Sequence, residues 1–268
     1  MTGRGLRIYA VIYLIFLYAP ILLLPLFAFN DGTIIAFPLQ GFTTRWFGEL
    51  VRTAALIEAA VNSVFIAIVT AILATCLGLF AARAGTRYQF PAKSGILGFI
   101  MLPLILPEII VAVALLVAML QAGISPSVWT VVAGHVLICT PFAIAILNGG
   151  FAHLDTSLEE AAIDLGATRW VAFRLITLPL VMPGTVAALL VCFTISLDEF
   201  IIAFFLSGNE PTLPVYLWGQ LRFPGRLPVI MALGTILVAL SVLLLLGAEY
   251  VRRRGLRRAG VKDTGGFL

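Results

Sequence analysis

The sequence predicts an all-α membrane protein with six transmembrane helices. Of its 268 residues, 61% are hydrophobic and 11% are charged, whereas a soluble domain usually carries about 25% charged residues. Apolar runs long enough to cross a bilayer, which takes about 20 residues, recur along the chain and leave room for only a single transmembrane domain over 1–268. Because lipid cannot satisfy backbone polar groups and the runs are too long for barrel strands, we expect helices. The six runs are 8–29, 57–82, 96–119, 128–150, 183–206 and 228–250.

The basic residues lie at the ends of the apolar runs and indicate the topology. With a cytoplasmic N-terminus, the outside segments hold only four of the 17 basic residues. The positive-inside rule therefore favours two cytoplasmic termini. The net charge of +4 is read as this topology signal, so the expected surroundings are membrane lipid and no nucleic acid is expected as a partner. The four outside residues are Arg45, Arg52, Arg222 and Arg226.

The first run, 8–29, is expected to be a retained helix. Its apolar core exceeds about 20 residues and contains Pro20 and Pro25, unlike the short core of a cleaved signal peptide. The second and fourth runs, 57–82 and 128–150, and the last, 228–250, are read as plain spans. The third and fifth runs, 96–119 and 183–206, differ because each contains acidic residues well inside the apolar stretch.

These acidic residues are Glu108 in the third run and the adjacent pair Asp198 and Glu199 in the fifth. A carboxylate at mid-bilayer costs about 3 kcal/mol, so all three should face a watery cavity or be neutralised. The helical rise of about 1.5 Å per residue places Asp198 about 12 Å and Glu108 about 17 Å from the outer ends of their helices. Ser196 and Glu199 are three residues apart and share a helix face.

No lysine or arginine lies within the apolar runs to pair with these carboxylates. We therefore expect the missing cation to be a transported cargo. The alternative is that the carboxyls are protonated and hydrogen-bonded between helices. The cysteines Cys76, Cys139 and Cys192 have no paired spacing and are expected to pack in the interior, so no metal site is predicted.

The inside loop between the fourth and fifth runs is polar. Ser157 followed three residues later by Glu160 is typical of a capping box at a helix start. Gly166 is placed to end that helix in a left-handed conformation. Thr168 can then cap a second short helix, which should stop before Pro179. Two short cytoplasmic helices are therefore expected over 151–179.

At this loop the sequence resembles the EAA motif of binding-protein-dependent ABC importer permeases. The resemblance implies the type I permease fold, in which the short helix docks into a cleft of an ATPase subunit. It also implies that Glu160 gives a charged contact, that Ala161 and Ala162 allow close packing, and that Gly166 makes the turn. The matching residues are Glu160, Ala161, Ala162, Gly166, Ile176, Leu178 and Pro179.

ATP hydrolysis is expected on another chain. A phosphate-binding loop needs Gly-Lys-Ser or Gly-Lys-Thr, and the only two lysines, Lys93 and Lys262, follow Ala92 and Val261. The chain is therefore expected to be no enzyme and to bind no cofactor itself, with ATP and Mg on the partner. The resemblance further implies an ATPase homodimer, a second homologous permease subunit and an external or periplasmic substrate-binding protein at a bacterial inner membrane.

The stretch from Ser196 to Phe200 also resembles the spermidine/putrescine branch of these permeases, in its second membrane subunit. The resemblance implies that the cargo is a polyamine. It places five residues on the cargo path, and the ring of one of them, Trp46, could offer a π face to an ammonium group or anchor the chain at the membrane interface. These residues are Trp46, Glu108, Ser196, Asp198 and Glu199.

Other functions remain open at this point. Related permeases carry ferric iron, sulfate, opines, amino acid derivatives or aminophosphonates. An ion-driven secondary transporter would use Glu108 and Asp198 as a proton relay and would need no ATPase. A membrane scaffold without a transport role would tolerate Asp198→Asn.

Overall fold

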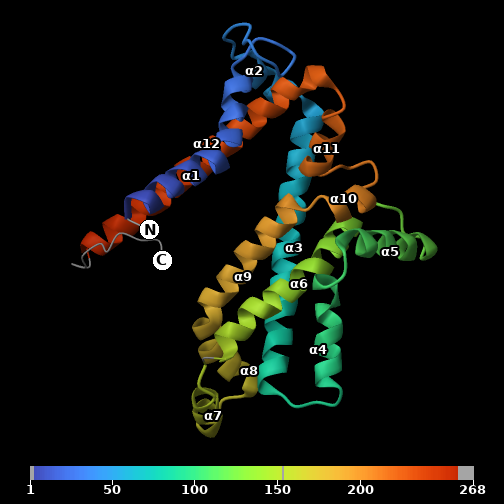
Figure 1. Ribbon diagram of the computed structural model, residues 1–268. Coiled ribbons are helices and arrows are strands. Elements are labelled where there is room, and N and C mark those ends of the chain that lie inside the picture. The colour runs from blue at the N-terminus through green and yellow to red at the C-terminus, as the bar shows by residue number, and fades with distance from the viewer. Residues whose placement is uncertain (1–2, 153, 259–268) are drawn as a thin grey trace. The chain divides into compact units, whose positions relative to one another are not determined.

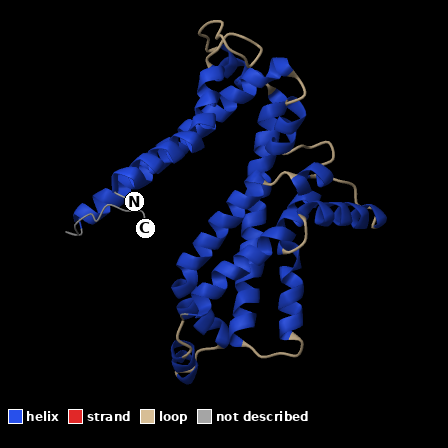
Figure 2. Cartoon of the chain, viewed as in Figure 1, coloured by secondary structure: helices blue, strands red, loops and turns tan. Residues whose placement is uncertain are grey.

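The computed structural model describes residues 3–152 and 154–258 and is helical almost throughout, which confirms the all-α expectation. Within these residues the only β pairing is an isolated bridge between Asn30 and Phe42. In the described part of the chain, five helices are long and apolar enough to cross a membrane, and a bent pair would make a sixth. The chain divides into two compact units. The first comprises residues 1–54 and 217–268, and the second comprises residues 55–216. Figures 1 and 2 show the helices of each unit.

The first unit contains the two ends of the chain. Its two long helices, α1 and α12, pack along each other, and α12 also contacts α2. Figure 1 shows α1 and α12 side by side. At their contact, a side chain added at Gly234 would meet Leu24 at 3.2 Å. The elements are α1 (Gly3–Ala28), α2 (Arg45–Arg52), η3 (Pro224–Arg226) and α12 (Leu227–Arg258).

The second unit holds the other spans and the acidic residues of the fifth run. Its tightest helix pair is α6 with α9, where the thiols of Cys139 and Cys192 each lie within 3.7 Å of the other residue's carbonyl oxygen. Its elements are α3 (Ala54–Arg87), α4 (Lys93–Met101), η1 (Leu102–Leu104), α5 (Glu108–Gln121), α6 (Val128–Ala152), α7 (Ser157–Asp164), α8 (Arg169–Ala172), η2 (Phe173–Thr177), α9 (Leu178–Asp198), α10 (Ile201–Leu206) and α11 (Leu213–Gln220), the last of which crosses into the first unit's residues.

Small residues let these helices approach closely. A Cβ at Gly78 of α3 would lie 2.5 Å from the Cβ of Ala143 on α6, and one at Gly134 of α6 would lie 2.5 Å from Ile202 on α10. Both separations are shorter than van der Waals contact, so only glycine fits. The apolar core of the unit forms around these contacts and includes Ile66, Ile138, Leu147, Phe151, Phe173, Ile202 and Leu206.

The run 96–119, expected as one helix, is two helices at an angle. Helices α4 and α5 are bent by 105° at the break, and Pro107 at the start of α5 has an extended backbone with ψ 129. A proline lacks an N–H and disfavours the helical conformation of the residue before it, so the helix ends there. Glu108 thereby becomes the first residue of a new helix.

The run 183–206 also differs from expectation. It starts earlier, because the helical path continues from Arg169 to Asp198 and does not stop before Pro179. The π-helical turn η2, from Phe173 to Thr177, directly precedes this proline. Its wider turn leaves space for a ring that would clash with the carbonyl four residues earlier in a regular helix. The run then breaks at Glu199, which has an extended backbone with ψ 125.

Candidate functional site

The break between α9 and α10 is held by the side chain of Glu199. The backbone N–H groups of Ile202 and Ala203 donate to its two carboxylate oxygens at 2.9 and 3.1 Å. These are donors at the start of α10 that have no partner within the helix. The carboxylate therefore caps α10, and Glu199 is 8% exposed.

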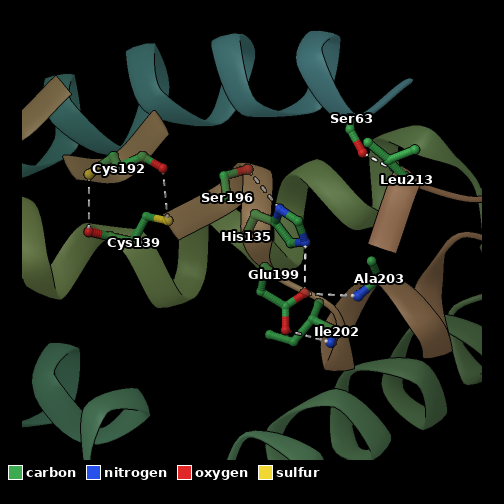
Figure 3. Close-up of polar contacts among 9 residues, drawn as sticks. All are labelled: Ser63, His135, Cys139, Cys192, Ser196, Glu199, Ile202, Ala203 and Leu213. Atoms are coloured by element: carbon green, nitrogen blue, oxygen red, sulfur yellow. Dashed lines mark hydrogen bonds and ion pairs between the residues drawn. The ribbon is translucent and has the colours of Figure 1, made fainter. Parts of the chain in front are cut away.

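His135 of α6 completes this buried group. Its Nε2 lies 3.0 Å from the Glu199 carboxylate, and its Nδ1 lies 2.8 Å from the Ser196 hydroxyl. The ring is fully buried, and Figure 3 shows its two contacts with Ser196 and Glu199. The imidazole thus contacts Glu199 through one ring nitrogen and Ser196 through the other. We call His135, Ser196 and Glu199 the buried triad.

The sequence interpretation missed His135 because it searched the apolar runs only for lysine and arginine. The available signal was a single histidine within the long apolar run 128–150. Its partners lie 61 and 64 positions further along the chain, so no local spacing connects them. For Glu199 the sequence predicted a partner outside the chain, whereas the structure places His135 of the same chain 3.0 Å from its carboxylate.

Asp198 and Glu108 have a different environment. Both are exposed in this chain, and neither forms a hydrogen bond or ion pair with any residue in 3–152 or 154–258. Asp198 is the last residue of α9 and Glu108 the first of α5, so each sits where a long apolar run is broken. Helix α5 packs against α10, which follows the other break.

Trp46 lies in the first unit and is buried within that unit. Its indole N–H donates to the Asn30 carbonyl at 2.8 Å. The guanidinium of Arg45 stacks over its ring at 4.1 Å from the centroid and pairs with Asp31 at 3.1 Å. One π face that was expected to meet a cargo ammonium is therefore covered by the chain's own cation.

The polar loop between α6 and α9 has the predicted turn but a different helix start. The expected capping box is wrong, because Ser157 is the first helical residue of α7 and its N–H donates at 3.0 Å to the carboxylate of Asp155. This bond is the main cause that lowers the pKa of Asp155 below its usual value, and the nearby charge of Arg87 adds to it. Thr168 caps α8 as predicted, by accepting from Val171 at 3.3 Å.

Gly166 ends α7 in the left-handed conformation, with φ +91. The N–H of Gly166 bonds the Ile163 carbonyl at 2.9 Å, and that of Ala167 bonds the Ala162 carbonyl at 3.0 Å. This double closure is the Schellman motif. Beside it, Leu165 is 90% exposed, and Glu160 and Ala161 are exposed while Ala162 is half-buried. The end of α7 thus presents an apolar side chain and small residues outward.

The comparisons with known proteins agree with this architecture. Residues 74–256 match the family described as "Binding-protein-dependent transport system inner membrane component". The chain is 33% identical to the Escherichia coli K12 spermidine/putrescine transport system permease protein PotC, with 94% of this chain and 96% of the relative covered. It is 36% identical to the putrescine transport system permease protein PotI of the same strain, with 91% and 92% covered.

More distant likenesses extend these matches. A putative 2-aminoethylphosphonate transport system permease protein of Salmonella paratyphi A is 27% identical over 91% of this chain and 92% of the relative. A crystal structure of a bacterial alginate ABC transporter in complex with an alginate-bound periplasmic protein superposes with a TM-score of 0.71 at 19% identity, covering 94% and 93% of the two chains. The superposition shows that the chain has the type I permease fold.

Proposed function

Because this chain belongs to the family of binding-protein-dependent transport system inner membrane components, we propose that it is a permease subunit of an ATP-driven importer for polyamines. The named polyamine permeases, 33% and 36% identical over nearly the whole chain, support this cargo. The proposed location is a bacterial inner membrane, with both termini in the cytoplasm as the arginine distribution indicates. The chain acts as a single transmembrane domain with a coupling loop at 151–179.

The observation that carries the cargo proposal is the difference between the two neighbouring carboxylates. Glu199 is satisfied by His135 and by two backbone N–H groups, whereas Asp198 has no partner among the described residues and is exposed. An unpaired carboxylate at a helix break inside an apolar run requires a cation or water. A polyamine carries the ammonium groups that would neutralise it.

We propose that Asp198 and Glu108 contact the cargo directly and that Ser196 and Glu199 shape the path by fixing the break. Both breaks leave irregular backbone within apolar runs, which is tolerated where it lines a cavity or is buried in protein. Trp46 contributes by holding the loop between Asn30 and Arg45. Its indole N–H bond and the stacked guanidinium support this indirect role.

The energy source is proposed to lie on other subunits. An ATPase homodimer would bind ATP and Mg and receive the end of α7 in its cleft, with Glu160, Ala161, Ala162 and Gly166 at the contact. The exposed Leu165 supports a docking role, because a large apolar side chain left in water favours a partner surface. A second homologous permease subunit and an external binding protein would complete the importer. The chain itself then catalyses no reaction.

Uptake by proteoliposomes that contain the full complex tests this function. Labelled putrescine and spermidine should accumulate, while sulfate should not. The compound 2-aminoethylphosphonate is a necessary competitor, since a relative is named for it and it also carries an ammonium group. Accumulation of anions alone would contradict the polyamine proposal. Uptake without any ATPase would instead favour an ion-driven transporter.

A further inference from the structure

One carboxylate of helix α7, that of Glu159, connects the helix to both α3 and η2. None of its eight residues is fully buried, and only Glu159 and Ala162 are half-buried. The helix therefore has no apolar anchor in the core of the unit. The chain leaves the C-terminal end of α7 through the left-handed turn at Gly166. Figure 1 shows α7 beside α8, near one end of α3.

The carboxylate of Glu159 joins α7 to two other elements. One oxygen lies 3.5 Å from the guanidinium of Arg83 on α3, and the other accepts a hydrogen bond from the hydroxyl of Thr177. Thr177 is fully buried and ends the π-helical turn that leads into α9. The side chains of Arg83 and Glu159 are only 12% and 16% exposed. Water therefore screens this pair much less than it screens a surface pair.

Arg83 is itself held in place by aromatic packing. Its guanidinium lies 4.2 Å from the ring centroid of Phe173, a fully buried residue of η2 that also contacts Phe80 of α3 at 6.3 Å between centroids. One turn further along α3, Arg87 donates to the Leu154 carbonyl at 2.8 Å. Cation–π packing restricts the arginine to one orientation. The contact between α3 and α7 is therefore preorganised.

We propose that Glu159 and Arg83 form the mechanical link that carries displacement of α7 into α3 and α9. This proposal rests on the proposed function, because α7 must be moved by an ATPase for the link to act. Glu160, which points outward, touches the partner, whereas Glu159 is a positioning residue that acts inside the permease. Without the link, a displacement of α7 would be absorbed at the Gly166 turn rather than reaching the long helices.

The test compares charge-neutral variants of the complete complex in proteoliposomes. The variants are Glu159→Gln, Arg83→Gln and their combination, and the matched control is Glu49→Gln, the same substitution at an exposed glutamate of α2 outside the coupling loop. Three quantities are measured: ATPase subunit retained per permease, ATP hydrolysis stimulated by the putrescine-loaded binding protein, and putrescine moved per ATP hydrolysed. A purely structural defect would lower the first quantity, while a broken link lowers the last two.

We expect each single variant to keep its ATPase subunit and to lose at least about fivefold in putrescine moved per ATP. The double variant should be no worse than the worse single variant, because both changes break one link. The control should stay within about twofold of the wild type. Transport per ATP within twofold of wild type for Glu159→Gln would overturn the proposal.

Three other outcomes would also overturn it: loss of the ATPase subunit from the Glu159→Gln complex, additive losses in the double variant, or an equal loss in the Glu49→Gln control. Failure of the proposed function is distinguishable from all of these. In that case the wild-type complex itself would accumulate no putrescine or would contain no ATPase, whatever the variants do.

Discussion

Replacing His135 by leucine should destabilise the protein strongly, because it leaves the buried carboxylate of Glu199 without its partner at 3.0 Å. Removing one member of a buried ion pair costs about 3–5 kcal/mol. Leucine fills a similar volume, so the loss comes from charge rather than from a cavity. For a chain of this size each kcal/mol lowers the melting temperature by about 2–4 °C. We therefore expect a decrease of about 10 °C, measured by thermal unfolding of the purified complex in nanodiscs.

A double variant separates charge from packing. Glu199→Gln keeps one oxygen that can accept a backbone N–H of α10, replaces the other with an NH2 group and removes the charge. Adding it to His135→Leu therefore removes the unpaired buried charge and should recover about 2 kcal/mol of the lost stability. The two single variants and the double variant form a mutant cycle. The reasoning is refuted if His135→Leu melts within about 2 °C of the wild type, or if the second change lowers the melting temperature further by its own full effect.

Three further predictions concern other parts of the site. Asp198→Asn should raise the KM for putrescine uptake at least about tenfold, whereas Glu199→Gln should chiefly lower the melting temperature. Equal KM values for Asp198→Asn and wild type would contradict the cargo role of Asp198. Gly166→Ala places a side chain at φ +91, which costs about 1–2 kcal/mol locally. Pull-down with this variant permease should therefore recover less ATPase subunit than pull-down with the wild type. Unchanged recovery would contradict a role for this turn in docking. In Gly134→Val the added Cβ would lie 2.5 Å from the Ile202 side chain. This overpacking should lower the melting temperature by an amount that corresponds to about 1–3 kcal/mol. An unchanged melting temperature would show that α10 is not held against α6.

Much of the fold could be predicted from the sequence, because hydrophobicity is summed over long stretches. The apolar runs gave the all-α class, and the glycine after α7 gave the left-handed turn that the structure has at Gly166. The sequence also predicted that Thr168 caps the second short helix, and its hydroxyl accepts a hydrogen bond from the Val171 N–H. These features depend on residues within a few positions of one another, where spacing alone is informative.

The breaks in the third and fifth runs could not be placed by hydrophobicity, since the apolar stretch continues on both sides of each break. Pro107 gave a usable signal for the first break. The second depends on the Glu199 side chain folding forward onto α10 and on His135 from another helix. Likewise, Pro179 was read as a stop because the π-helical turn that accommodates it has no simple sequence signature.

The nucleotide dependence of putrescine uptake tests the central claim most directly. Proteoliposomes that contain this chain, its partner permease and the ATPase subunit should be supplied with the loaded binding protein on one side and ATP on the other. The account predicts accumulation with ATP and none with a non-hydrolysable analogue. Accumulation at the same rate with the analogue, or with this chain as the sole protein, would contradict it.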